Sequence, residues 1–247
     1  LRALGRRARM VAAGATVVLG LGMTSSEARA QTPLGGPSLA AGDIAIVGRI
    51  NNISPDHFAI VTLAPIPTGT NIFFTDNGWQ TSTFRTGEGV RRLQVTSAIE
   101  RGRVIRSNDS SADFVWSTVS GDLNFVGAGD QLYAFQATSA TLPLTTITRH
   151  VAVFDDTGAF ETASDSSSGA VPPGLSIAGG TAVTLSGAAT TTLISTASLA
   201  SGTKAEWLTA ISNTSTWGSG ASLPSGARVV NPYTVISDTT AGGSAGN

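Results

Sequence analysis

The chain has 247 residues, of which 13% are charged, and its formal net charge is −1. Cysteine is absent, which excludes disulfide bonds, thiolate metal sites and a cysteine nucleophile. Beyond residue 30 there are 10 basic and 15 acidic residues, a balance of −5 that argues against a phosphate-binding surface, because nucleic-acid affinity depends on clustered lysine and arginine.

Residues 1–30 have the organisation of a secretory signal peptide. Four arginines up to Arg9 precede an uncharged apolar run, residues 11–23, and Ala28-Arg29-Ala30 matches the small-x-small pattern of a signal-peptidase site. The run is shorter than the about 20 residues that a membrane-spanning helix needs. We therefore expect an exported protein, in the periplasm, at the cell surface or outside the cell, with no membrane span in the mature chain. A membrane anchor is the alternative.

The remaining sequence predicts short β-strands. Threonine and valine are frequent, and turn residues such as those of "PIPTG" at 65–69 separate the apolar runs. In 131–136, Leu132, Ala134 and Gln136 should face one side of a sheet, and Tyr133 and Phe135 the other. The predicted strands are 43–48, 58–63, 70–75, 90–97, 103–107, 131–136, 146–154, 182–185 and 228–235. Short strands separated by turn signals are typical of β-sandwiches and barrels.

One segment near the C-terminus predicts a short helix, residues 204–212, "KAEWLTAIS". Thr203 and Glu206 have the spacing of a capping box, in which each side chain pairs with a backbone amide of the other. The apolar residues of one helical face are Trp207, Leu208 and Ile211. We expect this face to pack Trp207 on the sandwich, with Trp217 covering the same edge.

Four segments follow from these patterns. They are a signal peptide at 1–30, a linker at 31–41, a β-sandwich domain at 42–236 and a flexible tail at 237–247. The linker and the tail are rich in small residues and glycine, a composition typical of flexible chain.

Five motifs occur in a characteristic order: "AGDIAIVG" at 41–48, "DHFAIVTL" at 56–63, "IPTGTNIFFTDNGW" at 66–79, "FRTGEG" at 84–89 and "GTKAEWLTAISN" at 202–213. With them the chain resembles a β-sandwich module of bacterial exported and cell-surface proteins. More distantly it resembles the lamin-tail type of immunoglobulin-like domain. The resemblance implies an immunoglobulin-like, lamin-tail-like β-sandwich in an extracellular setting. It implies no reaction and no catalytic residue.

Catalytic motifs are weak in this sequence. Ser54, Asp56 and His57 are near neighbours, so an extended chain points them to different sides, and no Gly-x-Ser-x-Gly elbow is present. His150 lies among β-branched residues in "ITRHVAVF", where we expect a half-buried strand histidine. Two histidines are too few for a common zinc site. Paired carboxylates for glycoside hydrolysis stay open, because the fold sets their spacing.

The stretch "FFTDNGW" at 73–79 raises the question of a metal site. Asp76, Asn77 and Glu88 supply hard oxygens of the kind that calcium binds, six to eight at a time. Asp-Asn-Gly is also a common turn sequence, because asparagine and glycine tolerate positive φ, here at Asn77 and Gly78. We favour a turn out of a core strand, after which Trp79 folds back over the sandwich edge, and keep calcium as the one possible cofactor.

These patterns favour a secreted, non-catalytic module of the cell surface or extracellular space that binds a protein or polysaccharide partner or supports an assembly. The alternative is a secreted hydrolase with a loop site near Asp76 and Glu88. A weaker third function is nucleic-acid association through one basic face formed by Arg91, Arg92, Arg101, Arg103 and Arg106. Ionisable side chains gathered in one deep pocket would favour the hydrolase. A closed sandwich with shallow loops would favour the module.

Overall fold

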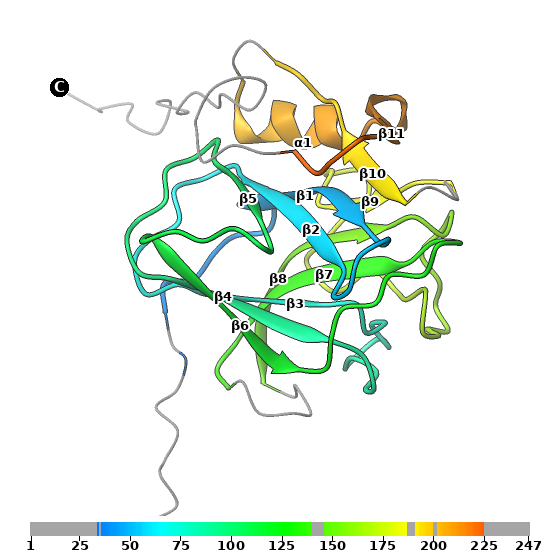
Figure 1. Ribbon diagram of the computed structural model, residues 1–247, viewed down its shortest axis with the longest axis horizontal. Coiled ribbons are helices and arrows are strands. Elements are labelled where there is room, and N and C mark those ends of the chain that lie inside the picture. The colour runs from blue at the N-terminus through cyan, green and yellow to red at the C-terminus, as the bar shows by residue number, and fades with distance from the viewer. Residues whose placement is uncertain (1–33, 35, 140–145, 187–190, 200–201, 225–247) are drawn as a thin grey trace, which may run out of the picture. The chain divides into compact units, whose positions relative to one another are not determined.

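The computed structural model describes residues 34, 36–139, 146–186, 191–199 and 202–224. In this part of the chain, two β-sheets pack face to face and one short helix covers one of them (Figure 1). The predicted all-β sandwich with a short helix near the C-terminus is confirmed. No helix in the described ranges is long and apolar enough to cross a membrane.

Two sheets contain the strands of the described residues. The strands are β1 Ile44–Ile50, β2 His57–Thr62, β3 Asn71–Thr75, β4 Val90–Val95, β5 Val104–Arg106, β6 Phe114–Ser120, β7 Gln131–Ala137, β8 Ile147–Asp155, β9 Ala182–Thr184, β10 Thr192–Ser195 and β11 Trp217–Ser219. The helix-side sheet has the order β11-β10-β1-β2-β5, and the loop-side sheet has the order β6-β4-β3-β7-β8-β9. Neighbouring strands are antiparallel except β8 and β9, which run parallel.

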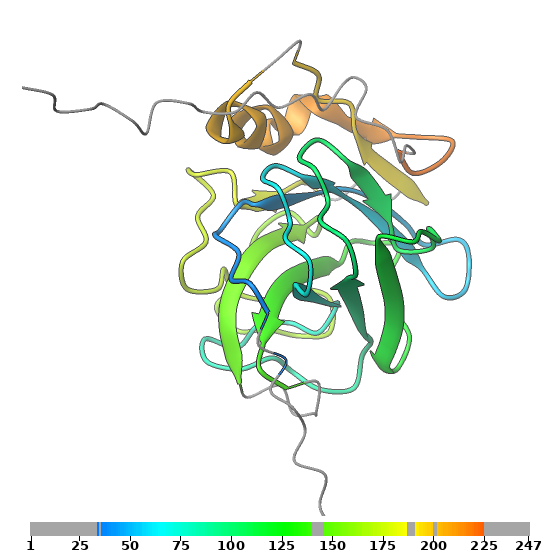
Figure 2. The same cartoon turned by 90° about the vertical axis from the view of Figure 1, so that its left-hand side faces the viewer.

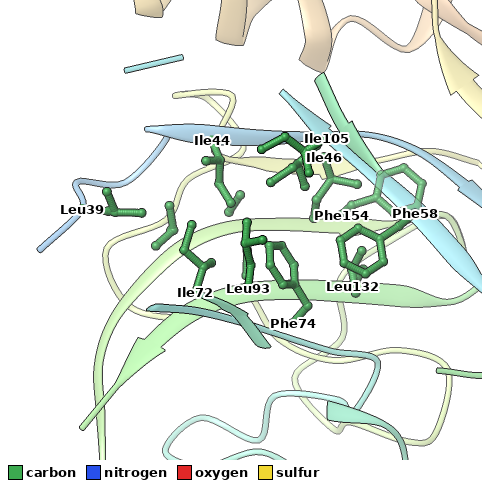
Figure 3. Packing of buried hydrophobic residues seen from close by; sticks show 14 of the residues in the cluster. Leu39, Ile44, Ile46, Phe58, Ile72, Phe74, Leu93, Ile105, Leu132 and Phe154 are labelled. Carbon is green, nitrogen blue, oxygen red and sulfur yellow. The ribbon is translucent and has the colours of Figure 1, made fainter. Parts of the chain in front are cut away.

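The main core lies between the two sheets, where alternate residues of facing strands meet. β1 contributes Ile44 and Ile46, and β3 contributes Ile72 and Phe74, all of them buried. Figure 3 shows these side chains between the strands of the two sheets. Burying one such side chain contributes about 1.5–3 kcal/mol. This layer therefore supplies stability that a chain without cysteine cannot obtain from disulfides.

The outer face of the helix-side sheet is covered by α1, Lys204–Ser212 (Figure 2). The helix buries Trp207, Leu208 and Ile211, as predicted. The Thr203 hydroxyl accepts from the Glu206 amide, and the Glu206 carboxylate accepts from the Thr203 amide, so the predicted capping box is confirmed. Alternation along β1 explains this second layer, because the residues between those of the main core face α1.

Trp217 lies beside the helix at the start of β11, after a short 3-10 helix, Thr214–Thr216. Its indole Nε1 donates to the carbonyl oxygen of Ile211 at 2.7 Å. Its ring stacks on Phe154, with the ring centroids 5.0 Å apart. The predicted place of Trp217 near the helix is confirmed, and the ring also reaches the core between the sheets.

A third apolar layer covers the outer face of the loop-side sheet. Phe73 and Phe135 project from β3 and β7, and loop residues Trp79 and Phe84 pack on them. Every residue of β3 and β7 is consequently buried. Trp79 was expected at the sandwich edge, and instead it lies on this outer sheet face. The layer matters for function because it orders the loops around the candidate site.

The strand predictions were confirmed for β1 to β5 and for β7 to β9 to within one or two residues at most ends. Three strands were missed: β6, β10 and β11. The predicted strand at 228–235, the signal peptide at 1–30 and the tail at 237–247 lie outside the described residues.

The predicted linker at 31–41 belongs in part to the sandwich. Leu39 is buried in the main core, and its amide donates to the side-chain oxygen of Gln136 at 2.7 Å. Leu34 donates to the carbonyl oxygen of Thr138 at 2.8 Å. The folded domain therefore begins before residue 42.

Candidate functional site

The predicted ligands Asp76 and Asn77 lie in the loop that leaves β3 at Thr75. The Thr75 hydroxyl donates to the carbonyl oxygen of Gly89 at 2.7 Å and accepts from the Asn77 amide at 3.1 Å. Asn77 Oδ1 accepts from the amide of Glu88 at 3.2 Å. These bonds join the start of the loop to its end, where β4 begins.

Gly78 does not have the positive φ that the turn sequence predicts. Among the described residues, the non-glycine residue with positive φ is Thr81, and neither Asn77 nor Gly78 has one. A Cβ atom at Gly78 would lie 2.7 Å from the carbonyl oxygen of Asp165 and 2.9 Å from that of Ser168. Glycine is therefore required here because another loop approaches closely, not because the backbone is left-handed.

Both carboxylate oxygens of Asp76 accept backbone hydrogen bonds. Oδ1 accepts from the Gly89 amide at 2.9 Å, and Oδ2 accepts from the Asn124 amide at 2.8 Å. Burial raises the pKa of Asp76 to about 6, against the lowering effect of these hydrogen bonds. Asp76 thus ties the loop between β3 and β4 to the segment that follows β6.

Glu88, the third predicted ligand, is half-buried near Asp76. Burial raises the pKa of Glu88 to about 7, and the negative charge of Asp76 raises it as well. Its Oε2 atom is buried and has no hydrogen-bond partner within the described ranges. Glu88 lines a cavity of about 20 Å³ together with Asn77 and Phe84. That volume is near the minimum that one water molecule needs.

Further buried acids surround this loop. Asp130 Oδ1 accepts from the Gln131 amide at 2.8 Å, and Oδ2 accepts from the Val126 amide at 2.8 Å. Burial raises the pKa of Asp130 to about 9, and the charges of Asp76 and Glu88 raise it as well. Like Asp76, Asp130 holds its carboxylate against backbone amides, so this pair of acids fastens loops to the end of the loop-side sheet.

Arg49 and Asp156 form a buried ion pair next to Asp130. Arg49 Nε donates to Asp156 Oδ2 at 2.8 Å, and its Nη2 contacts the same oxygen. Asp156 Oδ1 accepts from the Asp130 amide at 2.6 Å. The ion pair thereby links β1 of the helix-side sheet to the acidic loops, and both side chains are enclosed.

The structure brings Asp76, Asn77 and Glu88 together at one loop. Asp76 and Asn77 use their side-chain oxygens for backbone amides of the same region. In the described part of the chain, no group of three or more histidine, aspartate and glutamate side chains is arranged to hold a metal ion. Calcium binding stays a prediction, and the ligands would have to exchange these hydrogen bonds for the ion.

The serine–histidine–aspartate candidates do not form a catalytic triad. The carboxylate of Asp56 accepts from the Phe125 amide at 2.5 Å. His57 Nδ1 lies 3.2 Å from the hydroxyl of Ser107, a residue that is fully buried. Ser54 is exposed and makes no hydrogen bond with this group among the described residues. A nucleophile must be reached by its substrate, so the buried Ser107 is unsuited to that role.

The arginines at 91–106 do not share one face. Arg91 and Arg92 are consecutive on β4 and therefore point to opposite sides of the sheet. The Arg91 guanidinium lies over the ring of Trp116, 5.5 Å from its centroid. Two other arginines form ion pairs, Arg103 with Asp113 and Arg106 with Asp109. The predicted single basic face is therefore wrong.

A larger pocket lies beside Trp79, at the start of β8. Its volume is about 470 Å³. It is formed where the loop between β3 and β4 meets the first residues of β8 and the loop around Pro173. Its lining residues include Trp79, Thr81, Ser82, Thr148, Arg149 and His150.

Two buried ring nitrogens belong to residues that line this pocket. The indole Nε1 of Trp79 and the imidazole Nδ1 of His150 have no hydrogen-bond partner among the described residues. The two rings lie nearly perpendicular, with centroids 4.5 Å apart. Burial lowers the pKa of His150 to about 4, so the imidazole is neutral at pH 7. A buried donor without an acceptor costs about 1–3 kcal/mol, which a bound polar group would offset.

Sequence reasoning missed this pocket although it noted two of its residues. Trp79 was assigned to packing, and His150 was expected as a half-buried strand histidine; both are in fact buried. The exposed Arg149 beside His150 was not singled out. The only signal in the sequence was Arg149 before His150 inside an apolar strand. This pair does not reveal that the loop with Trp79 packs against His150.

A scan against protein-family models finds no match, and neither do searches of curated proteins and of solved structures. The resemblance to a lamin-tail-like module of bacterial exported proteins therefore stays a prediction.

Proposed function

We propose that the protein is an exported β-sandwich module of the cell surface or extracellular space, which binds a partner and catalyses no reaction. One observation carries the proposal. The buried acids Asp76 and Asp130 hold backbone amides in place, whereas the larger pocket lies beside Trp79 and His150, and no carboxylate of the described residues lines it. Among the described residues, its polar lining offers groups that can bind a ligand but no pair of acids.

The alternative hydrolase near Asp76 and Glu88 requires at least one carboxylate that can reach a substrate. Asp76 is 1% exposed, and the cavity at Glu88 has a volume of only about 20 Å³. Pockets that bind small molecules have volumes of about 300–1,000 Å³. These observations favour a binding module, and the hydrolase stays an untested alternative.

The proposed setting comes from the sequence. The arginine-rich start, the apolar run and Ala28-Arg29-Ala30 favour export, and the motif order favours an immunoglobulin-like or lamin-tail-like type of sandwich. A stable sandwich with ordered loops suits a module that presents a preformed surface outside the cell. The partner would be a protein or a polysaccharide.

The experiment pairs a binding assay with an activity assay on the same purified protein. We expect binding to members of a glycan and protein array, and no turnover of chromogenic glycosides and esters. Turnover that Asp76→Asn and Glu88→Gln each abolish, with an unchanged circular dichroism spectrum, would establish the hydrolase instead. Tyr133→Phe, a buried substitution outside the acidic loop, controls for general loss of fold.

A further inference from the structure

We infer that the outer edge of β6 binds an extended acidic segment of a protein partner, which adds to the loop-side sheet as a further strand. The inference rests on the proposed function as a binding module and names the surface and the kind of partner. Among the edge strands of the two described sheets, β5, β9 and β11 have three residues each, whereas β6 has seven. β6, which lies beside β4 at the end of its sheet (Figure 1), therefore offers the longest edge for such pairing.

The sequence of β6 does not protect this edge. Proteins usually blunt a long edge strand with charged residues or proline, because its unpaired backbone groups recruit other strands. β6, "FVWSTVS", contains neither a charged residue nor a proline. Its Val115 is 51% exposed and adds an apolar contact. An extended peptide that adds to a sheet edge uses backbone hydrogen bonds and side-chain contacts of this kind.

The strand register identifies the backbone groups that a new strand would meet. The amide of Val95 on β4 donates to the carbonyl oxygen of Thr70 at 2.9 Å, and it therefore points away from β6. Hydrogen bonds between antiparallel strands alternate, so Phe114, opposite Val95, directs its own amide and carbonyl groups away from β4. Trp116 and Thr118 follow with the same period of two. Within the described ranges, no backbone group bonds to this outward row.

Arg91 brings a positive charge to the same edge. Arg91 lies on β4, and its guanidinium extends over the ring of Trp116 on β6, 5.5 Å from the ring centroid. Arg91 forms no ion pair with the described residues, and its Nε atom is buried there without a hydrogen-bond partner. Burial lowers the pKa of Arg91, and the charge of Asp122 acts in the opposite direction. A half-buried charge without a partner is unfavourable, so a carboxylate delivered by a new strand would be stabilising.

The two faces of β6 predict the pattern of the partner segment. Trp116 packs on the main core, and Arg91 lies over its ring, so the acidic side chains of the new strand should lie on this face. Val115 faces the other side, where apolar side chains of the partner can pack on it. The segment should therefore alternate acidic and β-branched residues. A second copy of β6 is a poorer occupant, because β6 has no carboxylate to offer Arg91.

Fluorescence anisotropy of a labelled peptide tests the inference on the purified protein. The peptide has capped ends and alternates valine and glutamate over about seven residues, the length of β6. We expect saturable binding that weakens about tenfold or more when lysine replaces glutamate, because the charge is reversed. N-methylation of the peptide amides that face β6 should weaken binding by a similar factor, since it removes backbone donors without changing the charge.

Two protein variants locate the site. Arg91→Gln should weaken the glutamate peptide about tenfold, because a charge-assisted contact is lost. Arg101→Gln is the matched control, because it removes an arginine of the turn between β4 and β5, outside both strands, and should leave the affinity unchanged. Urea unfolding checks that both variants are folded. The peptide comparisons use the wild-type protein, so they decide the question even where a variant does not fold.

Four results would overturn the assignment. They are an absence of binding at millimolar peptide, equal binding of the glutamate and lysine peptides, equal binding of the N-methylated peptide, and equal affinity of Arg91→Gln and Arg101→Gln. A dimer in sedimentation equilibrium that excludes the peptide would assign the edge to a second copy instead. An array partner that Arg91→Gln binds as tightly as wild type would reject this edge and preserve the proposed binding function. Turnover in the activity assay would reject the proposed function and leave the peptide titration unchanged.

Discussion

The carboxylate of Asp76 accepts a hydrogen bond from the amide of Gly89 at 2.9 Å, and this bond closes the loop between β3 and β4. Gly89 is tightly enclosed, because a Cβ atom there would lie 2.4 Å from the carbonyl carbon of Asp122. The second oxygen of Asp76 holds the amide of Asn124. The carboxylate of Asp76 therefore holds two segments in place. They are the loop between β3 and β4, which helps to line the larger pocket, and the segment that follows β6.

Asp76→Ala should lower the free energy of unfolding by about 2 kcal/mol or more. The substitution leaves the amides of Gly89 and Asn124 without acceptors, and a buried unpaired donor costs about 1–3 kcal/mol. Asp122→Ala, at an exposed position in the neighbouring loop, should stay within about 0.5 kcal/mol of wild type. Urea unfolding measures both, and equal effects would contradict the anchoring role of Asp76.

Gly78→Ala should destabilise by about 1–3 kcal/mol, the usual cost of overpacking. The new methyl group would meet the carbonyl oxygens of Asp165 and Ser168. Gly218→Ala is the matched control, because its backbone is not left-handed and a Cβ there meets nothing within 4 Å. Thermal unfolding compares the two. A tolerated Gly78→Ala would show that the loop at Asp165 moves aside readily.

Trp207→Ala should cost about 3–5 kcal/mol, because the ring is fully buried between α1 and the helix-side sheet. Thr203→Ala should cost only about 1 kcal/mol through the lost helix cap. Thr209→Ala, at an exposed position of the same helix, should be close to neutral. Urea unfolding of the three variants measures these costs. Small and equal losses for Trp207 and Thr203 would mean that the helix contributes little packing.

The sequence was sufficient where a strand has a clear apolar pattern. β1, β2 and β3 are short apolar runs with turn residues at their ends, and the structure places them as predicted. β6, "FVWSTVS", was missed because it is an edge strand whose residues are mostly half-exposed. β10 and β11 are too short for a period to emerge.

The candidate pocket could not be predicted because its parts come from distant segments. Pairing of β3 with β7, and of β7 with β8, brings His150 to the loop that contains Trp79. No local pattern encodes that register. Asp130 differs, because its carboxylate accepts from the amides of Val126 and Gln131, which are close to it in sequence, and the sequence gives no sign that this acid is buried. Composition identifies an acid but not the amides that will enclose it.

Glu88→Gln should change stability in a pH-dependent way. Burial raises the pKa of Glu88 from its usual 4.5 to about 7, so the folded protein binds this proton more tightly than the unfolded chain does. The protonated Glu88 carboxyl therefore stabilises the folded protein. This stabilisation is fully present below about pH 4.5 and is lost as the pH rises through about 7. Glutamine does not titrate. The variant should match wild type at pH 4 and exceed its urea midpoint at pH 8.

Other groups titrate in the same range but cancel in this comparison. Burial also raises the pKa of Asp76 and Asp155, each to about 6, and lowers that of His150 to about 4. All three are present in both proteins, so their own titrations largely cancel. The difference between the two midpoints reports the Glu88 carboxyl together with its charge interaction with Asp76 and Asp130. A difference that stays constant from pH 4 to pH 8 would show that the Glu88 carboxyl has the same pKa in the folded and unfolded states.

Calcium should leave the melting temperature unchanged. An ion bound only to the folded state stabilises it by about 2.7 kcal/mol at a hundredfold excess over Kd, so a real site is easily detected. At Asp76 both oxygens already accept backbone amides, and Asn77 Oδ1 accepts another. Calcium would have to displace these bonds and gather six or more oxygens around the loop.

Melting with millimolar calcium and then with chelator measures the effect. A rise that disappears in the Asp76→Ala, Glu88→Ala double variant, and persists in Asp122→Ala, would establish a calcium site and overturn our preference for a turn fastened by hydrogen bonds.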